Sequence, residues 1–355
     1  MTSPLRILLI RRDNIGDLIC TTPLLRALRE HLPEASISIL VSSYNVEVLE
    51  ENKDIDRTFI FLKRRHDNHG HHPLSVIWKR WQLKRFLRKE KFDYILLANG
   101  GWRYARKLRG KITVGFQERD RPPSQQPDIT IPREAPGPVE EHEVSKLARL
   151  GTILKIPLKN SLGPTYLFPN KILVEQQRQR LLAAGWDSSK PTIGVHISAR
   201  CPMRVWPEHY FVTLIKKIVT AEKAQIVLLW SPGLINNPKH PGDDEKAASL
   251  LRSLQGLPVF GAPTTTVSQL IAVSSLLDQM ICSDGGAMHV AAALQKPILS
   301  FFGASSIESW HPWKTPYIAL RTPSHQVKDI TAEEALAGFF ELQKKITRKN
   351  QESSF

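Results

Sequence analysis

Cysteine is scarce in this chain: its 355 residues include three cysteines, without the spacing of a disulfide framework or of a zinc site. Long apolar runs are also missing, and the short apolar segment near Met1 cannot serve as a signal sequence or a membrane span. There is no internal repeat of short period, and no Asp-x-Asp metal motif ends a predicted strand. We therefore expect a cytoplasmic protein that contacts a membrane at most peripherally.

Positive charge, in contrast, is abundant. The formal net charge is +15, from 49 Lys and Arg residues against 34 Asp and Glu residues. This balance predicts an anionic partner, which can be nucleic acid, a phospholipid surface or a phosphorylated substrate. With 41% hydrophobic residues, a chain of this length can bury a full core, and the length itself predicts two domains.

Short apolar segments alternate with helical patterns through both halves of the chain, which predicts a doubly wound α/β architecture. The proline-rich segment 119–138 is predicted to be a loop, and the interdomain linker is expected near residues 158–169. The predicted strands are 6–10, 36–41, 59–62, 94–97 and 113–116 in the first half, and 192–197, 226–230, 276–281 and 298–303 in the second.

A paired glycine turn, Ser283-Asp284-Gly285-Gly286, follows one of these strands and leads into a predicted helix that carries His289. The first N–H groups of a helix have no partner within the helix, and its dipole favours negative charge at that end. The turn is therefore predicted to bind an anion such as a phosphate.

The segment from Lys63 to Lys91 is basic, and its second part fits an amphipathic helix with tryptophan and phenylalanine anchors. Three interpretations remain open: an ordinary surface helix, a peripheral contact with anionic lipid, or a nucleic-acid contact. His66, His69, His71 and His72 suggest a metal site, but no carboxylate or cysteine is arranged with them, so a loop is favoured.

Four segments together resemble glycosyltransferase family 9, the ADP-heptose–lipopolysaccharide heptosyltransferases. They are residues 14–28, residues 196–199 with 204–207, residues 283–294 and residues 297–303, in an order that extends over nearly the whole chain. The resemblance implies the GT-B fold, in which two Rossmann-like doubly wound domains face an interdomain cleft. It places the acceptor domain at 1–165, the nucleotide-sugar domain at 166–330, and at 331–355 a helix packing back toward the first domain, with a frayed tail.

For the donor, the resemblance implies a diphosphate site in the second domain. Arg204 stands at the family's Lys/Arg position before Trp-Pro, and its guanidinium fork suits phosphate; an exposed loop arginine is the alternative. Asp284 is expected to accept hydrogen bonds from sugar hydroxyls, while Gly285 and Gly286 present N–H groups to phosphate. Many relatives carry Ser or Thr where this chain has Gly285, so only the backbone contact is carried over.

Further donor contacts are expected from Ser198 and from the backbone of Ala199, at the same diphosphate. His289 either binds phosphate or is a buried structural histidine. Glu245, or its neighbour Asp244, is assigned to the ribose or adenine of the nucleotide.

For the acceptor, Asp17 matches the family's proposed catalytic base, which takes the proton of the attacking hydroxyl. The alternative is a helix N-cap, since Asp17 precedes an apolar helical pattern. Basic residues near the ends of the first strands are expected to meet carboxylates or phosphates of the acceptor, with plain surface solvation as the alternative. They are Arg11, Arg12, Lys63, Arg64 and Arg65.

The sequence thus predicts an inverting transferase that moves heptose from ADP-heptose to an inner-core acceptor of lipopolysaccharide at the inner membrane leaflet. No cofactor, metal or nucleic acid is expected, and the family is described as metal-independent. Two alternatives stay open. One is a transferase of the same fold with another nucleotide sugar or a protein or other glycan acceptor. The other is a basic membrane- or nucleic-acid-binding module without catalysis.

Overall fold

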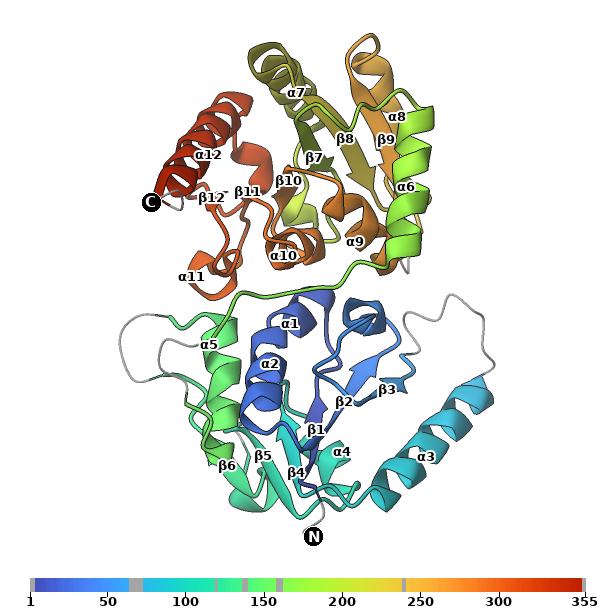
Figure 1. Ribbon diagram of the computed structural model, residues 1–355, viewed down its shortest axis with the longest axis vertical. Coiled ribbons are helices and arrows are strands. Elements are labelled where there is room, and N and C mark those ends of the chain that lie inside the picture. Colours follow the sequence, from blue (N-terminus) through green and yellow to red (C-terminus); the bar gives the residue numbers. More distant parts are fainter. Residues whose placement is uncertain are drawn as a thin grey trace. The chain divides into compact units, whose positions relative to one another are not determined.

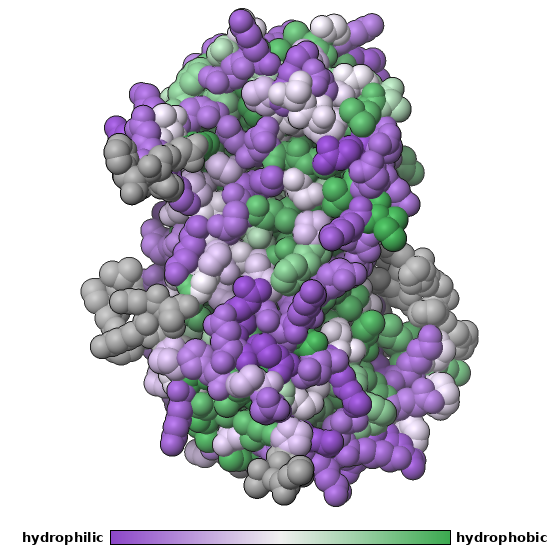
Figure 2. All heavy atoms as spheres, in the orientation of Figure 1, coloured by the Kyte–Doolittle hydropathy of each residue, from purple (hydrophilic) through white to green (hydrophobic). Residues whose placement is uncertain are grey.

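The chain forms two compact units, Met1–Thr165 and Tyr166–Phe355, in a computed structural model that describes residues 4–63, 73–118, 121–135, 140–157, 162–237 and 241–352 (Figure 1). Each unit is built on its own six-stranded sheet of parallel strands. Seen as spheres, both units carry mainly hydrophilic side chains on the visible face (Figure 2). The apolar strands lie beneath this polar surface.

The first unit has the strand order β3-β2-β1-β4-β5-β6. The apolar run Ile7–Ile10 is almost fully buried, because β1 lies between β2 and β4 in the middle of the sheet. The strands are β1 (Arg6–Ile10), β2 (Ser36–Ser42), β3 (Arg57–Phe61), β4 (Tyr94–Leu97), β5 (Ile112–Phe116) and β6 (Ile129–Ile131).

The helices of the first unit connect these strands. The helical pattern predicted from Leu18 to His31 is divided at Cys20 and Thr21 into two helices, and the segment Val46–Leu49 forms a 3₁₀ turn. The α-helices are α1 (Ile15–Ile19), α2 (Thr22–His31), α3 (Pro73–Lys89), α4 (Trp102–Arg106) and α5 (Glu143–Ala148).

The second unit repeats the topology, with the order β12-β11-β10-β7-β8-β9. In both units the first strand lies between the second and the fourth, so the strand order reverses beside it. The strands are β7 (Thr192–His196), β8 (Gln225–Trp230), β9 (Val259–Pro263), β10 (Gln279–Ser283), β11 (Ile298–Phe301) and β12 (Tyr317–Leu320). The expected fold of two doubly wound α/β domains is confirmed.

The helices of the second unit cover its sheet, and the buried indole of Trp206 joins several elements. Trp206 donates from Nε1 to the Ile330 carbonyl at 2.8 Å, and its ring lies 4.6 Å from that of Phe301. The α-helices are α6 (Lys171–Ala183), α7 (Glu208–Glu222), α8 (Asp244–Ser253), α9 (Val267–Ser275), α10 (Gly286–Ala293), α11 (Ile307–Trp310) and α12 (Ala332–Glu352).

Helix α12 begins with the expected capping box. Thr331 Oγ1 accepts a hydrogen bond from the Glu334 N–H, and the Glu334 carboxylate accepts one from the Thr331 N–H at 2.7 Å. The helix packs on α7, β11 and β12 of its own unit. The return of this helix toward the first domain stays a prediction.

Three strands are not predicted by the sequence analysis: β6, β9 and β12. All three are short edge strands of their sheets, with few fully buried residues. The β6 strand also lies inside the proline-rich segment that was expected to be a loop, and this expectation is wrong for Ile129–Ile131. Within the described ranges, no helix is both long and apolar enough to cross a membrane.

Candidate active site

In both units, polar side chains follow the strands at which the strand order reverses. Residues 11–17 follow β1, next to β4, in the first unit. In the second unit Ser198 follows β7, and Asp284 follows the neighbouring β10. Ligands of open parallel sheets bind at the carboxyl ends of the strands beside such a reversal. Each unit therefore has a candidate binding site of its own at this edge of the sheet.

In the first unit, a buried arginine joins three carboxylates. The side chain of Arg11 is 1% exposed, and Nη2 donates to Asp17 Oδ1 at 3.0 Å and to Glu143 Oε1 at 2.9 Å. Its Nη1 donates to the carbonyl of Ala98 at 2.7 Å, and its Nε lies 3.1 Å from Asp13 Oδ1. The guanidinium therefore links Asp17 to the end of β4 and to α5, and it neutralises part of the charge of the three carboxylates.

Asp13 is a carboxylate of this cluster with a perturbed acidity. Burial raises its pKa to about 6, with Asp17 adding to the increase and Arg11 opposing it. Burial also raises the pKa of the Cys20 thiol, which lies in the core of this unit. Cys20 is consequently a neutral packing residue rather than a nucleophile.

Asp17 lies in the first turn of α1, and its side chain is 17% exposed. The N-cap position belongs to Asn14, so the alternative assignment of Asp17 as the N-cap is wrong. The Asp17 carboxylate instead pairs with Arg11 while keeping part of its surface accessible. A carboxylate that is oriented but not sealed off is suited to accept a proton from a bound hydroxyl.

The basic residues assigned to the acceptor are placed differently from the expectation. Arg11 is not available to an acceptor, because its side chain is buried among carboxylates. Arg12 stacks 4.6 Å from the ring centres of both Phe61 and Tyr104, and burial lowers the pKa of its guanidinium. Lys63 Nζ donates to the backbone carbonyl of Asp13 at 3.0 Å. Arg64 and Arg65 lie outside the described residues.

In the second unit, Arg204 and the glycine turn are joined directly. Arg204 donates from Nη1 to the Asp284 carbonyl at 3.0 Å and from Nη2 to Ser305 Oγ at 2.7 Å. Its Nη2 also lies 3.2 Å from Asp284 Oδ2, while Ser283 Oγ donates to the Arg204 carbonyl at 2.7 Å. Since the Arg204 side chain is 32% exposed, it keeps an accessible face beside the turn.

The turn leads into α10 with extended backbone. Gly285, the N-cap, has φ 161° and ψ −166°, and a Cβ built on it meets nothing within 4 Å. Gly286, which the sequence analysis places in the turn, is the first residue of α10. His289 is buried one turn later and packs edge-on against Trp310, with ring centres 6.0 Å apart. This environment favours the structural role for His289.

The remaining residues that the sequence analysis assigns to the donor lie near the ends of β7 and β8. Ser198 Oγ accepts a hydrogen bond from the Ser231 N–H at 2.9 Å, which leaves its own proton for a further acceptor. Ala199 is half-buried and Glu245 is exposed in the first turn of α8. Asp244, the alternative to Glu245, accepts from Trp230 Nε1 and from the Gly233 N–H, so it is occupied in holding the loop.

Sequence reasoning missed several partners that complete these sites. Glu143 starts a helix 132 positions from Arg11, and Ser305 lies 101 positions from Arg204, so only the tertiary fold brings each pair together. Lys246 donates to the carbonyls of Ile197 and Trp206, and burial lowers the pKa of its ammonium group. In the described part of the chain, no group of three or more His, Cys, Asp or Glu side chains is arranged to hold a metal ion.

Comparison with known proteins gives a consistent result. A family model described as glycosyltransferase family 9 (heptosyltransferase) matches residues 80–338. Lipopolysaccharide heptosyltransferase 2 of Escherichia coli K12 is 24% identical over 345 residues, which cover 93% of this chain and 92% of the relative.

Solved structures show the same fold over almost the whole length. The structure of a family 9 glycosyl transferase from Veillonella parvula aligns with a TM-score of 0.79 at 18% identity, covering 97% of this chain and 99% of that one. The E. coli ADP-heptose lps heptosyltransferase II aligns with a TM-score of 0.73 at 19% identity, covering 97% and 100%. The described topology is therefore that of known transferases.

Proposed function

The chain belongs to glycosyltransferase family 9 and is a glycosyltransferase, and from this premise we propose that it transfers heptose from ADP-heptose to an inner-core sugar of lipopolysaccharide. Support for this donor and acceptor comes from the names of similar proteins, which include lipopolysaccharide heptosyltransferase 2 and an ADP-heptose heptosyltransferase. The observation that carries the chemistry is the Asp17 carboxylate held by the buried Arg11.

In the proposed reaction, Asp17 removes the proton from an acceptor hydroxyl as that oxygen attacks the anomeric carbon of the donor sugar. The bond between this carbon and the diphosphate oxygen breaks, and its electron pair leaves with ADP. A single displacement of this kind inverts the anomeric configuration. Arg11 contributes by orientation, because its hydrogen bond to Asp17 limits the positions that the carboxylate can take.

The leaving diphosphate is assigned to the second unit. The accessible face of Arg204 supplies positive charge, and the first N–H groups of α10 supply hydrogen-bond donors. Asp284 Oδ2 is buried 3.2 Å from Arg204 Nη2, so this carboxylate orients the arginine, and Asp284 is further assigned to accept hydrogen bonds from the sugar hydroxyls. The proposal uses these groups in place of a metal ion or cofactor.

Donor binding gives the first test, by calorimetry with ADP-heptose and with UDP- and GDP-sugars on the full chain. We expect ADP-heptose to bind and the others to bind at least tenfold more weakly. Product formation is then followed as ADP release, with and without EDTA, and the product's anomeric configuration is determined. Preference for another nucleotide sugar, loss of turnover with EDTA, or retention of configuration would each contradict the corresponding part of the proposal.

The proposal also includes the cellular setting. The proposed acceptor is a glycolipid at the inner leaflet of the cytoplasmic membrane. We therefore propose a cytoplasmic protein that associates peripherally with this membrane. The net charge of +15 is suited to an anionic acceptor and an anionic surface.

A further inference from the structure

Helix α3 carries large apolar side chains on the side that does not pack on the sheet. Leu74, Ile77, Trp78 and Trp81 are 69%, 55%, 58% and 49% exposed, and their spacing places them on one side of the helix, here termed the α3 outer face. On the opposite side, Val76 and Leu87 are buried. The exposure is therefore a property of one face and not of a loosely packed helix.

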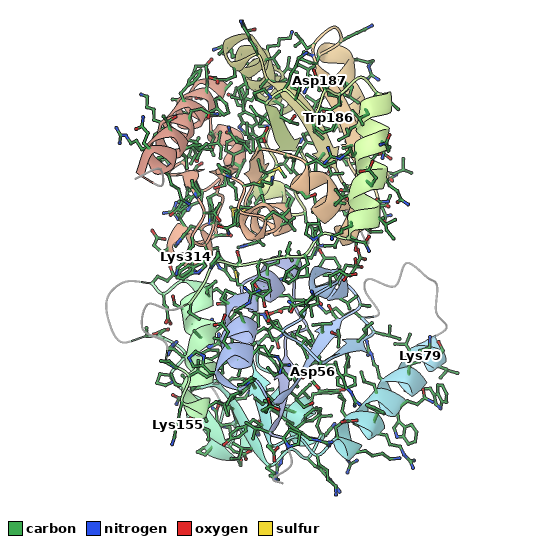
Figure 3. All side chains as sticks on the ribbon, in the orientation of Figure 1. Asp56, Lys79, Lys155, Trp186, Asp187 and Lys314 are labelled. Carbon is green, nitrogen blue, oxygen red and sulfur yellow. The ribbon has the colours of Figure 1, made fainter. Side chains whose placement is uncertain are left out.

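The same helix is exclusively basic in its charge. Its residues Pro73–Lys89 include six Lys or Arg residues and no Asp or Glu. Arg80 turns inward, donating from Nε to the Leu62 carbonyl at 2.9 Å and stacking 4.5 Å from the Phe61 ring centre. Lys79, labelled on α3 in Figure 3, and Arg85 and Lys89 are exposed, so cations flank the apolar outer face.

An open groove of about 730 Å³ lies between α3 and the edge strand β3. Its lining includes the apolar side chains of Phe59, Ile60, Leu83 and Phe86, with the Phe59 and Phe86 ring centres 5.7 Å apart. Lysines at positions 79 and 89 also line it. An apolar groove with cationic side chains matches a lipid, which joins an acyl chain to an anionic headgroup.

We infer that the α3 outer face and the adjoining groove dock on an anionic phospholipid bilayer. Tryptophans with aliphatic side chains beside a basic face are typical of helices that lie in the membrane interface. A second copy of the chain is a poor occupant, because two faces of the same positive charge repel each other. Binding of nucleic acid would use the cations and tryptophans, but it would not bury the exposed aliphatic side chains of Leu74, Ile77 and Ile60.

This inference rests on the proposed function in one respect, namely that the acceptor is a membrane lipid. Binding of the protein to vesicles can nevertheless be measured without donor or acceptor. The test is flotation of the full chain with phosphatidylcholine vesicles, with and without phosphatidylglycerol. We expect binding only to the anionic vesicles, weakening with salt. The Arg85→Gln/Lys89→Gln variant should bind about 25-fold more weakly, since each of the two cations contributes roughly fivefold. The Trp78→Ser/Trp81→Ser variant should bind the anionic vesicles at least tenfold more weakly.

Matched controls come from α6 of the second unit. Ile172→Ser/Leu182→Ser removes exposed apolar side chains, and Lys171→Gln/Arg180→Gln removes one exposed lysine and one exposed arginine. Both should bind vesicles as the unchanged protein does. Because all these positions are exposed, melting temperatures should stay equal, and a variant that melts early is replaced by the single substitutions.

Activity separates the inference from the proposed function. With a deacylated, water-soluble acceptor, the α3 variants should retain full turnover, whereas on acceptor embedded in anionic vesicles they should slow. Vesicle binding without any heptose transfer would contradict the proposed function and leave the docking surface intact. The inference is overturned if α3 variants bind vesicles normally, if the unchanged protein ignores anionic vesicles, or if it binds an RNA oligonucleotide through α3 instead.

Discussion

Arg11 donates a hydrogen bond from Nη2 to Asp17 Oδ1 at 3.0 Å, with the arginine side chain 1% exposed. The same nitrogen donates to Glu143, and Nη1 donates to the Ala98 carbonyl, so three elements fix one guanidinium. A mobile carboxylate would sample many positions around an acceptor hydroxyl. Here the geometry of the proposed base is determined by a residue that an acceptor cannot reach.

Replacing Arg11 by lysine tests this positioning role. Lysine keeps the charge, but it lacks the planar guanidinium that donates hydrogen bonds to Ala98, Asp17 and Glu143 at the same time. We expect turnover to fall about 100-fold, since misplacing a catalytic group by an ångström costs that much, while ADP-heptose affinity is unchanged. Arg26→Lys, at an Arg–Asp pair where the arginine is 40% exposed, is the control and should change little. Unaltered turnover of Arg11→Lys would show that Asp17 needs no such support.

Asp13 predicts a particular dependence of stability on pH. Its pKa is about 6 in the folded protein against an ordinary value of 3.8, so the folded state retains a proton that the unfolded state has already released. Its contribution to the free energy of unfolding therefore falls as pH rises through this window, by an amount on the order of 3 kcal/mol. Asp13→Asn cannot titrate and should lack this decline.

The measurement is denaturant unfolding of both proteins between about pH 4 and pH 7. The unchanged protein alone is not diagnostic, because burial lowers the pKa of His196 to about 4 and makes that residue's contribution rise with pH in the same window. The difference between the two proteins isolates Asp13. Parallel profiles would mean that Asp13 is not perturbed.

Arg204 should contribute to donor affinity. Removing a charge-assisted contact to phosphate costs roughly 1.5–3 kcal/mol, so Arg204→Ala is expected to bind ADP about 10- to 150-fold more weakly in calorimetry. Arg252→Ala, at an exposed arginine in the last turn of α8, serves as the control of equal charge change. Equal ADP affinity of the two variants would remove Arg204 from the donor site.

Substitutions at two glycines of the second unit should differ strongly in their effect on stability. Gly285 has extended backbone and free space around a Cβ, so Gly285→Ser should change the free energy of unfolding by less than about 0.5 kcal/mol. Its hydroxyl should raise ADP affinity. In Gly242→Ala the new Cβ would overlap the backbone of Gly233, and we expect the free energy of unfolding to fall by at least about 2 kcal/mol. Thermal melts compare the two directly, and equal losses would contradict the described loop geometry.

Much of the fold could be predicted because its signals are local. The central strands are continuous apolar runs, and the glycine turn and the Trp-Pro segment of the proposed donor site are both recognisable in the sequence. Edge strands such as β9 and β12 are short and partly exposed, so their patterns resemble loops. Arg11 shows a different limit, since burial of a charged residue depends on partners that the sequence does not identify.

The central claim is that Asp17 accepts the acceptor proton in heptose transfer, and Asp17→Asn tests it most directly. Asparagine keeps the size of the side chain and one oxygen for Arg11 but cannot take a proton. Transfer to a deacylated acceptor is followed by mass spectrometry, and ADP-heptose binding by calorimetry, for both proteins. The account predicts unchanged donor affinity with turnover reduced at least 100-fold. Turnover by Asp17→Asn at the rate of the unchanged protein would contradict it.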